Sequence, residues 1–331
     1  MFKRLVSFLM VISLLFSTGF VDAVAIAVQD QEDQPEQVTV QVGDVSDMFV
    51  VEETEPEPTE TEATEATETT APAETTPVII TAEATDFTYT VLESGGCSIT
   101  AYTGAATAEL VIPGELDGYV VEAIGRNAFY KVTTLQSVTL PDSVLSIGSQ
   151  AFYGCTALTD IRLSANLTEI GYGAFMRCTG LTQLALPATV KTIGGQAFVD
   201  CTSLSSVTYP AGLEDVSNMG DGIFVGCTAL TSMEIPEGVT ALPDYVFQDA
   251  ASLQSVTLPS TLKTIGDYAF EGSGIVEMTL PASVTSVGSQ AFANCTALTD
   301  IQLSESLMEI GYGAFMKCTG LTQLADRKSV V

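Results

Sequence analysis

Seven cysteines are the residues of this chain best suited to chemistry, and six of them recur at one place in a repeated pattern. Each of the six lies three residues after a phenylalanine: Cys155, Cys178, Cys201, Cys227, Cys295 and Cys318. Thiolates bind zinc, but no C-x-x-C pair is present, and a single column of thiols cannot surround a metal tetrahedrally. Neighbours such as Cys178 and Cys201 could come within disulfide range, although parallel side chains make the required dihedral angle awkward. We therefore expect small buried thiols that pack a turn.

Acid–base and nucleophilic catalysis find little support. The chain has no histidine, so the commonest general base is missing and neither a Ser-His-Asp nor a Cys-His arrangement can form. Glu214, Asp215 and Asp221 are close in sequence and could offer oxygen ligands to calcium. A pair of carboxylates could also imitate a glycosidase site, but nothing in the sequence flanks them with a substrate cleft. We expect a non-enzyme with no cofactor and no metal site.

The ends and the charge of the chain limit its location and partners. The formal net charge is -30, which repels nucleic acid and argues against DNA or RNA as a partner. Lys3 and Arg4 precede an apolar run, Leu5–Phe16, that has signal-peptide length and is too short for a comfortable membrane span. We predict a signal peptide over residues 1–27 and an exported protein without a transmembrane span after signal removal. An uncleaved membrane helix is the alternative.

Residues 28–86 have the composition of a stalk. The segment is rich in Thr, Glu, Ala and Pro, and residues 30–86 contain 17 acidic residues with no Lys or Arg. Such a segment cannot bury enough apolar surface to offset the entropy of ordering, and its like charges repel one another. We predict a disordered acidic tether here.

A phenylalanine marks a repeat in the rest of the chain. It occurs at Phe129, Phe152, Phe175, Phe198, Phe224, Phe247, Phe270, Phe292 and Phe315, with gaps of 23, 23, 23, 26, 23, 23, 22 and 23 residues. A fixed period of this size indicates a solenoid, because one coil cannot enclose its own apolar side chains and stacked coils can. We predict about nine coils, dominated by strands, with short helical or 3₁₀ turns at the Ala-Phe pairs.

One coil, Leu158 to Gly180, shows the expected geometry. Ile161 and Leu163 are two residues apart, so both should point inward from a strand while Arg162 points outward. A Gly then permits a tight turn. Two coils depart from the period: the 26-residue gap holds LEDVSNMGDG, which predicts a bulging loop, and the 22-residue gap holds EGSGIVEM, in which SG replaces CTA.

The stretch LQSVTLPDSVLSIGSQAFYGC (Leu135–Cys155) resembles the repeat of the bacterial BspA-like leucine-rich repeat proteins. The resemblance extends over residues 87–325. It implies a leucine-rich-repeat solenoid over residues 124–325, preceded at residues 87–123 by a capping β region with SITAYTG and ELVIP as strands. It also implies adhesion to host proteins, matrix or other microbes.

Two near-identical blocks point to a duplication within the array. Gly148–Ala185 and Gly288–Ala325 are offset by 140 residues and agree at 31 of 38 positions. Copying a block costs no global rearrangement in a stack where each coil contacts only its neighbours. The second copy then runs into DRKSVV, which puts charge where the next strand should bury Leu. We expect residues 326–331 to be an artefactual or truncated end and the natural chain to continue.

The outward strand positions form a small, polar surface, and we predict that a protein partner binds there. Solvated strand side chains without a partner are an equally good interpretation. The candidate residues are Thr139, Thr159, Asp160, Arg162, Gln183, Ser206, Thr208, Glu234, Thr257, Glu277, Asp300 and Gln302.

The expected function is non-catalytic recognition or adhesion by a secreted or cell-surface protein. A further C-terminal segment would attach it to the cell wall. Two alternatives remain open. One is a structural spacer that presents another module, and the other is a non-catalytic subunit of a glycan-degrading complex.

Overall fold

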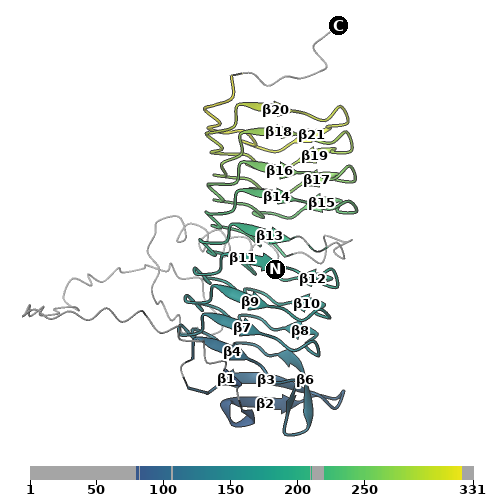
Figure 1. The fold of residues 1–331 in the computed structure, drawn as a ribbon. Helices are drawn as coiled ribbons and strands as arrows, with labels where there is room; N and C mark the ends of the chain where they lie inside the picture. Colours follow the sequence, from purple (N-terminus) through teal and green to yellow (C-terminus); the bar gives the residue numbers. More distant parts are fainter. Residues whose placement is uncertain (1–79, 82, 106, 209, 211–219, 323–331) are drawn as a thin grey trace, which may run out of the picture. The chain divides into compact units, whose positions relative to one another are not determined.

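The computed structural model describes residues 80–81, 83–105, 107–208, 210 and 220–322. The predicted signal peptide, most of the predicted stalk, most of the predicted bulging loop and residues 326–331 lie outside these ranges. The described residues form a stack of coils that runs from β2 (Phe87–Val91) at one end to β20 (Asp300–Gln302) and β21 (Glu309–Ile310) at the other (Figure 1). The predicted strand-dominated solenoid is confirmed.

Each coil contributes one short strand to a column that we call the front. Two-residue to three-residue strands suffice because each needs to pair only with the coils above and below. The front strands are β1 (Ile80–Thr81), β4 (Glu109–Val111), β7 (Ser137–Thr139), β9 (Asp160–Arg162), β11 (Gln183–Ala185), β13 (Ser206–Thr208), β14 (Ser232–Glu234), β16 (Ser255–Thr257), β18 (Glu277–Thr279) and β20.

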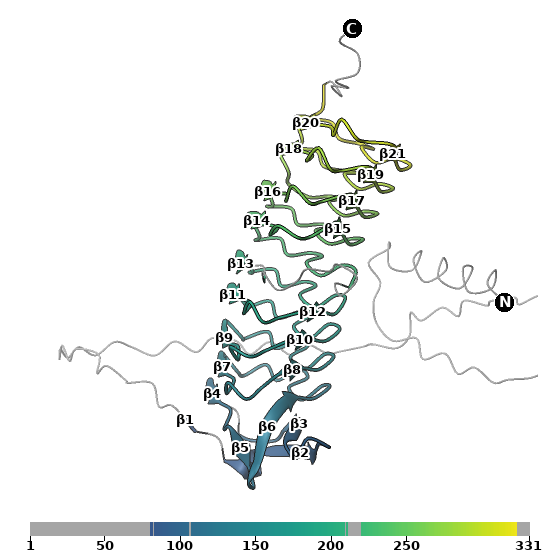
Figure 2. The same cartoon turned by 90° about the vertical axis from the view of Figure 1, so that its right-hand side faces the viewer.

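A second column of two-residue strands lies on another side of the stack, as the turned view in Figure 2 shows. Its members beyond the N-terminal end are β8 (Ser146–Ile147), β10 (Glu169–Ile170), β12 (Thr192–Ile193), β15 (Ala241–Leu242), β17 (Thr264–Ile265), β19 (Ser286–Val287) and β21. All these strands pair in parallel with the strand of at least one neighbouring coil, as Glu169 does with Ser146 and Thr192.

The front column does not form one continuous sheet. Among the described residues it divides into β1-β4-β7-β9, β11-β13, β14-β16 and β18-β20. The second column divides into β12-β10-β8-β6-β3-β2 and β15-β17-β19-β21. The front ladder is therefore interrupted at several places, and these interruptions shape the surface described below.

The core is a set of aligned apolar columns. The middle residue of each front strand points inward, as Ile161 does with 6% exposure between exposed Asp160 and Arg162. The marker phenylalanines stack on one another with ring centroids 4.8 to 5.8 Å apart. Phe175, for example, is fully buried between Phe152 and Phe198. The columns are continuous because every coil places the same residue type at the same depth.

The short helical turns expected at the Ala-Phe pairs are not formed; the structure has hydrogen-bonded turns there instead. Alternate backbone N–H groups leave the coil, so that Phe152 donates to Ala174 O and Gly154 donates to Met176 O, each at 2.8 Å. The residue between them bonds locally, since Tyr153 N–H donates to Gln150 O at 3.1 Å. A helix would direct every N–H group along its own axis and leave the next coil unpaired. The described 3₁₀ helix is η1 (Ala84–Asp86), outside the repeats.

The glycine after each inward Ile or Val has a different role from the one predicted. At Gly171 the backbone φ is not in the left-handed region, so no tight turn demands glycine. A Cβ there would instead lie 2.6 Å from Ser149 N and 2.7 Å from Gly148 C in the preceding coil. Glycine is required because two backbones approach closely, which also lets Gly171 N–H bond to Ile147 O at 2.7 Å.

The N-terminal end of the stack is closed by β2, β3 (Cys97–Tyr102), β5 (Glu115–Leu116) and β6 (Tyr119–Ile124). β3 pairs in parallel with β6, and β2 pairs antiparallel with β3 as the outermost strand. Tyr102 stacks on Phe129 at 5.6 Å and so extends the aromatic column into this region.

Two predicted boundaries shift in this region. β1 and η1 lie within the segment assigned to the stalk, because Ile80 and Thr81 pair with the edge of β4. The parallel ladders also begin before residue 124, since β4 and β6 already pair with β7 and β8. Both boundaries depend on strand pairing with residues distant in sequence, and the local composition does not indicate this pairing.

Candidate partner-binding face

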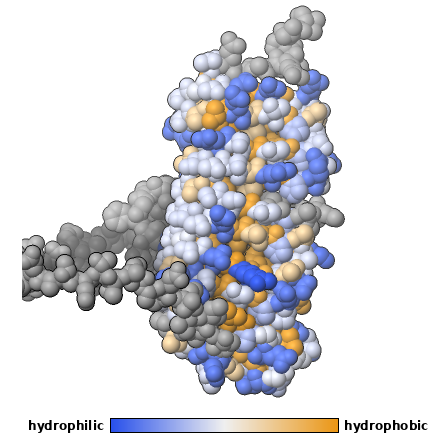
Figure 3. Space-filling model, in the orientation of Figure 1, coloured by the Kyte–Doolittle hydropathy of each residue, from blue (hydrophilic) through white to orange (hydrophobic). Residues whose placement is uncertain are grey.

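The outward side chains of β7, β9, β11, β13, β14, β16, β18 and β20, with the residue before each strand, form what we call the front face. It carries all twelve predicted residues. Eleven of them are exposed, and Thr139 is half-buried. In Figure 3 the strand region is pale and weakly polar, and an apolar band runs beside it along the stack. The face is thus extended and chemically plain, without a concentration of catalytic groups.

Part of this polarity serves the fold itself. The hydroxyl of Thr159 donates to Gln136 O at 3.0 Å, in the preceding coil. Ser205 and Thr299 make the same bond to the carbonyls of their preceding coils at 3.0 and 3.1 Å. The residue before several of the front strands therefore bonds coil to coil. Of the predicted binding residues, Thr159 is assigned a structural hydrogen bond by this geometry.

Charge is distributed unevenly over the face. β9 carries both signs, Asp160 and Arg162, whereas β14 to β20 carry Glu234, Glu277 and Asp300 without a basic residue. Glu277 and Asp300 are register partners on neighbouring strands, so two like charges lie side by side. Like charges at paired positions disfavour folding, and a cationic partner would relieve the repulsion.

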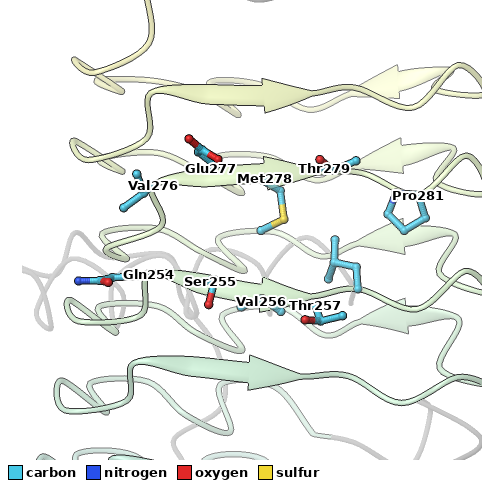
Figure 4. A pocket seen from close by; sticks show the side chains of 10 residues that line it. Gln254, Ser255, Val256, Thr257, Val276, Glu277, Met278, Thr279 and Pro281 are labelled. Carbon is cyan, nitrogen blue, oxygen red and sulfur yellow. The ribbon is translucent and has the colours of Figure 1, made fainter.

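A hollow opens in the front face between β16 and β18, and we call it the slot. Its volume is about 780 Å³. Met278 points from β18 toward β16, as Figure 4 shows, and Val276 stands at the start of β18 with 38% of its surface exposed. The lining residues are Gln254, Ser255, Val256, Thr257, Leu258, Val276, Glu277, Met278, Thr279 and Pro281.

The slot has a cause that is visible in the sequence. Its coil is the one with the 22-residue spacing, in which Ser273 and Gly274 replace the usual Cys-Thr-Ala. Within the described part of the chain, no ladder joins β16 to β18. Val276 occupies the position of Thr159 and Thr299, so the hydroxyl that should bond the preceding coil is missing.

Thr257 and Glu277 were the only predicted residues among those that line the slot. Val256, Leu258, Val276, Met278 and Pro281 were missed, because only outward polar positions were considered. The short spacing and the valine in a column of Thr, Ser and Gln were the available signals. A smaller hollow of about 320 Å³, lined by Val207, Thr208, Glu234 and Pro236, lies at the similar interruption between β13 and β14.

The cysteines are buried and free, as expected. Each thiol of the column donates to the carbonyl of a phenylalanine in the preceding coil, as Cys201 does to Phe175 O at 3.2 Å and Cys295 to Phe270 O at 2.9 Å. Burial raises the pKa of Cys201 and of Cys295 to about 12. These thiols are therefore protonated and unreactive at neutral pH.

No group of three or more Cys, Asp or Glu side chains suited to a metal ion occurs among the described residues. Glu214 and Asp215 of the calcium alternative lie outside them. Asp221 is described, and burial, followed by the nearby charge of Asp244, raises the pKa of its carboxyl. Likewise, along the described ranges no helix has the length and apolarity needed to cross a bilayer.

Comparison with models of protein families shows which family the chain matches. Residues 122–218 and 217–330 match the model of the BspA-type leucine-rich repeat region, in six copies. The chain belongs to the BspA-type leucine-rich repeat family. The resemblance seen in the repeat is thereby confirmed, and the match covers more than half of the chain.

Solved structures of leucine-rich repeat proteins are similar to this chain. A protein from Bacteroides ovatus is 24% identical, with a TM-score of 0.48 over 72% of this chain and 80% of that one. The T. pallidum leucine-rich repeat protein is 27% identical, with a TM-score of 0.48 over 75% and 94%. A leucine-rich cell surface protein from Faecalibacterium prausnitzii is 27% identical, with a TM-score of 0.49 over 71% and 73%. No curated protein matches the chain.

Proposed function

We propose that this protein is a non-catalytic recognition protein, secreted or held at the bacterial cell surface, that binds host or microbial proteins through the front face. The observation that carries the proposal is the face itself: a row of largely exposed side chains that extends along the stack, one strand per coil. Repeat arrays offer such extended surfaces to protein partners. Family membership supports a repeat scaffold of this kind.

A surface location fits the sequence. The predicted signal peptide exports the chain, and the predicted acidic tether would hold the repeats away from the point where they emerge. The thiol column is compatible with export because its members are buried, and the raised pKa of Cys201 and Cys295 makes these two thiols slow to oxidise.

The test is binding of the full chain to immobilised extracellular-matrix proteins and to intact bacterial cells. The test variant reverses four charges of the front face: Asp160→Lys, Arg162→Glu, Glu234→Lys and Asp300→Lys. The matched control makes the same change in net charge elsewhere on the surface: Glu93→Lys, Glu169→Lys, Lys191→Glu and Glu309→Lys.

We expect the front-face variant to lose most binding and the control to retain it. Equal binding by the wild type and the front-face variant would reject the front face as the recognition surface. Both variants should give the circular dichroism spectrum of the wild type, since all eight side chains are exposed.

A further inference from the structure

We propose that the slot between β16 and β18 binds an extended, basic segment of a partner protein. One apolar side chain of that segment enters the slot, and a neighbouring Lys or Arg side chain reaches Glu277 and Asp300. The inference rests on the proposed function, because it names the part of the front face that selects the partner and the chemistry that it selects.

The first support is the interrupted ladder. β16 pairs with β14 and β18 pairs with β20, whereas within the described chain the two facing edges belong to different sheets. The two coils still meet at the start of these strands, where Val276 N–H donates to Gln254 O at 3.3 Å. Strand edges without a ladder partner can bond to an extended segment that lies across the slot from outside. This favours an extended peptide over a helix or a small rigid ligand.

The second support is the apolar interior. Met278 is 3% exposed and forms the inner wall with half-buried Val256, while half-buried Leu258 and Pro281 line the far end. Methionine is flexible enough to adapt to side chains of different shape. The volume of about 780 Å³ lies in the usual range of ligand pockets, about 300–1,000 Å³.

The third support is Val276. The other coils from β7 to β20 place Gln, Ser or Thr at this position, and Thr159, Ser205 and Thr299 use their hydroxyls to bond the preceding coil. A valine that is 38% exposed gives up this bond and presents two methyl groups at the entrance. The coil thereby exchanges a structural contact for an apolar surface.

Charge identifies the occupant. Glu277 lies at the rim of the slot, and Asp300 is its register partner on β20. The sequence between Thr192 and Met316 has a single basic residue, Lys263. The chain's own acidic segment has 17 acidic residues and no basic one over residues 30–86, and a second copy carries a net charge of -30. Both would be repelled, whereas a basic segment is attracted.

The experiment measures fluorescence polarisation of labelled nonapeptides with the full chain at near-physiological ionic strength. One peptide alternates Lys and Val, a second alternates Glu and Val, and a third alternates Lys and Gly. The protein variants are Val276→Thr, Glu277→Gln and, as a matched acid-to-amide control outside the front face, Glu169→Gln on β10.

We expect the Lys–Val peptide to bind more tightly than the Lys–Gly peptide, and the Glu–Val peptide not to bind. Val276→Thr should weaken Lys–Val binding about fourfold, the value of one buried methyl group. Glu277→Gln should weaken it about threefold, as for an exposed ion pair. Glu169→Gln should leave it unchanged.

Hydrogen exchange gives a readout that does not depend on the peptide chosen. The Thr of Val276→Thr can bond to Gln254 O, so the amides of Glu277–Thr279 should exchange more slowly in this variant. The proposal that the slot binds a basic segment is overturned if the Lys–Val peptide does not bind. It is also overturned if this peptide binds equally to Val276→Thr, Glu277→Gln and the wild type. The charge-reversal experiment described under the proposed function would then still test, independently, whether the front face is the recognition surface.

Discussion

At the residue scale, the thiol column shows how one side chain serves the stack. A cysteine is small enough for the turn, and its weak S–H donor reaches a carbonyl of the preceding coil, as Cys227 reaches Phe198 O at 3.2 Å. The hydrogen bond satisfies a carbonyl in a place closed to water. The thiols are thus structural, and their protonation state is tied to folding.

This link predicts a loss of stability at alkaline pH. The pKa of Cys201 is about 12 in the folded chain, whereas an exposed thiol titrates near about 8.5. Above about pH 8.5 the unfolded chain therefore holds fewer protons than the folded one, and the free energy of unfolding falls as pH rises. One unit above that pH, each such thiol contributes a loss of about 1.4 kcal/mol.

Urea midpoints measured from pH 7.5 to 9.5 test this sign. The midpoint should be steady at first and then fall. Cys201→Ala, which removes one titrating group, should flatten the fall even if it lowers stability overall. A midpoint that stays level to pH 9.5 would contradict the buried, protonated column.

At the element scale, the distance between successive coils is set by backbone contact as much as by side chains. Gly171 brings its Cα against Ser149 and Gly148 of the preceding coil. The sequence predicted a glycine-dependent turn at this place. The periodicity correctly gave the front strand of the coil, whereas the two-residue strand β10 before the glycine was not predicted. It could not reveal the close approach, because contact between coils depends on residues 23 positions apart.

Gly171→Ala should therefore destabilise the array although alanine is a small residue. The added Cβ would meet Ser149 N at 2.6 Å, and we expect a loss of about 1–3 kcal/mol, as for overpacking. Gly114→Ala is the matched control, because its Cβ would meet only Pro141 Cβ at 4.0 Å. Urea denaturation should show the first loss and little change in the control; equal stabilities would reject the close-approach argument.

The same limit applies to the slot. The sequence marked its coil by a 22-residue spacing and by Val276. It did not show that β16 and β18 lack a common ladder. A coil that is one residue shorter can lose that residue from a turn as easily as from the pairing of its strand. The twelve polar residues of the front face follow from alternation alone, which is why they were found and the inner wall of the slot was not.

At the scale of the whole molecule, each coil is buried by its neighbours and by little else. The duplicated blocks show this directly. Ile170 is fully buried, whereas its duplicate Ile310, in the last described coil, is 47% exposed. The residue and its local sequence are the same, so the difference comes from the neighbouring coil. Stability should accordingly add up coil by coil.

Removing one complete coil should therefore be tolerated. Deletion of Leu158–Gly180 joins Ala157 to Leu181 in phase, and we expect a folded array with cooperative unfolding and a urea m-value lower by about a tenth. Circular dichroism and urea titration measure both. Deletion of Leu158–Thr168 alone breaks the phase and should abolish cooperative unfolding. Loss of folding in the in-phase deletion would show that the array depends on contacts beyond nearest neighbours.

The duplication also has an immunological consequence. β9 and β20 lie on the same column of the stack (Figure 1) and come from blocks that agree at 31 of 38 positions. Their exposed Asp160 and Asp300 are six coils apart, roughly 29 Å at about 4.8 Å per strand spacing. An antibody raised against one block should cross-react with the other, and Arg162 against Gln302 is the exposed strand difference by which a clone could tell the two epitopes apart.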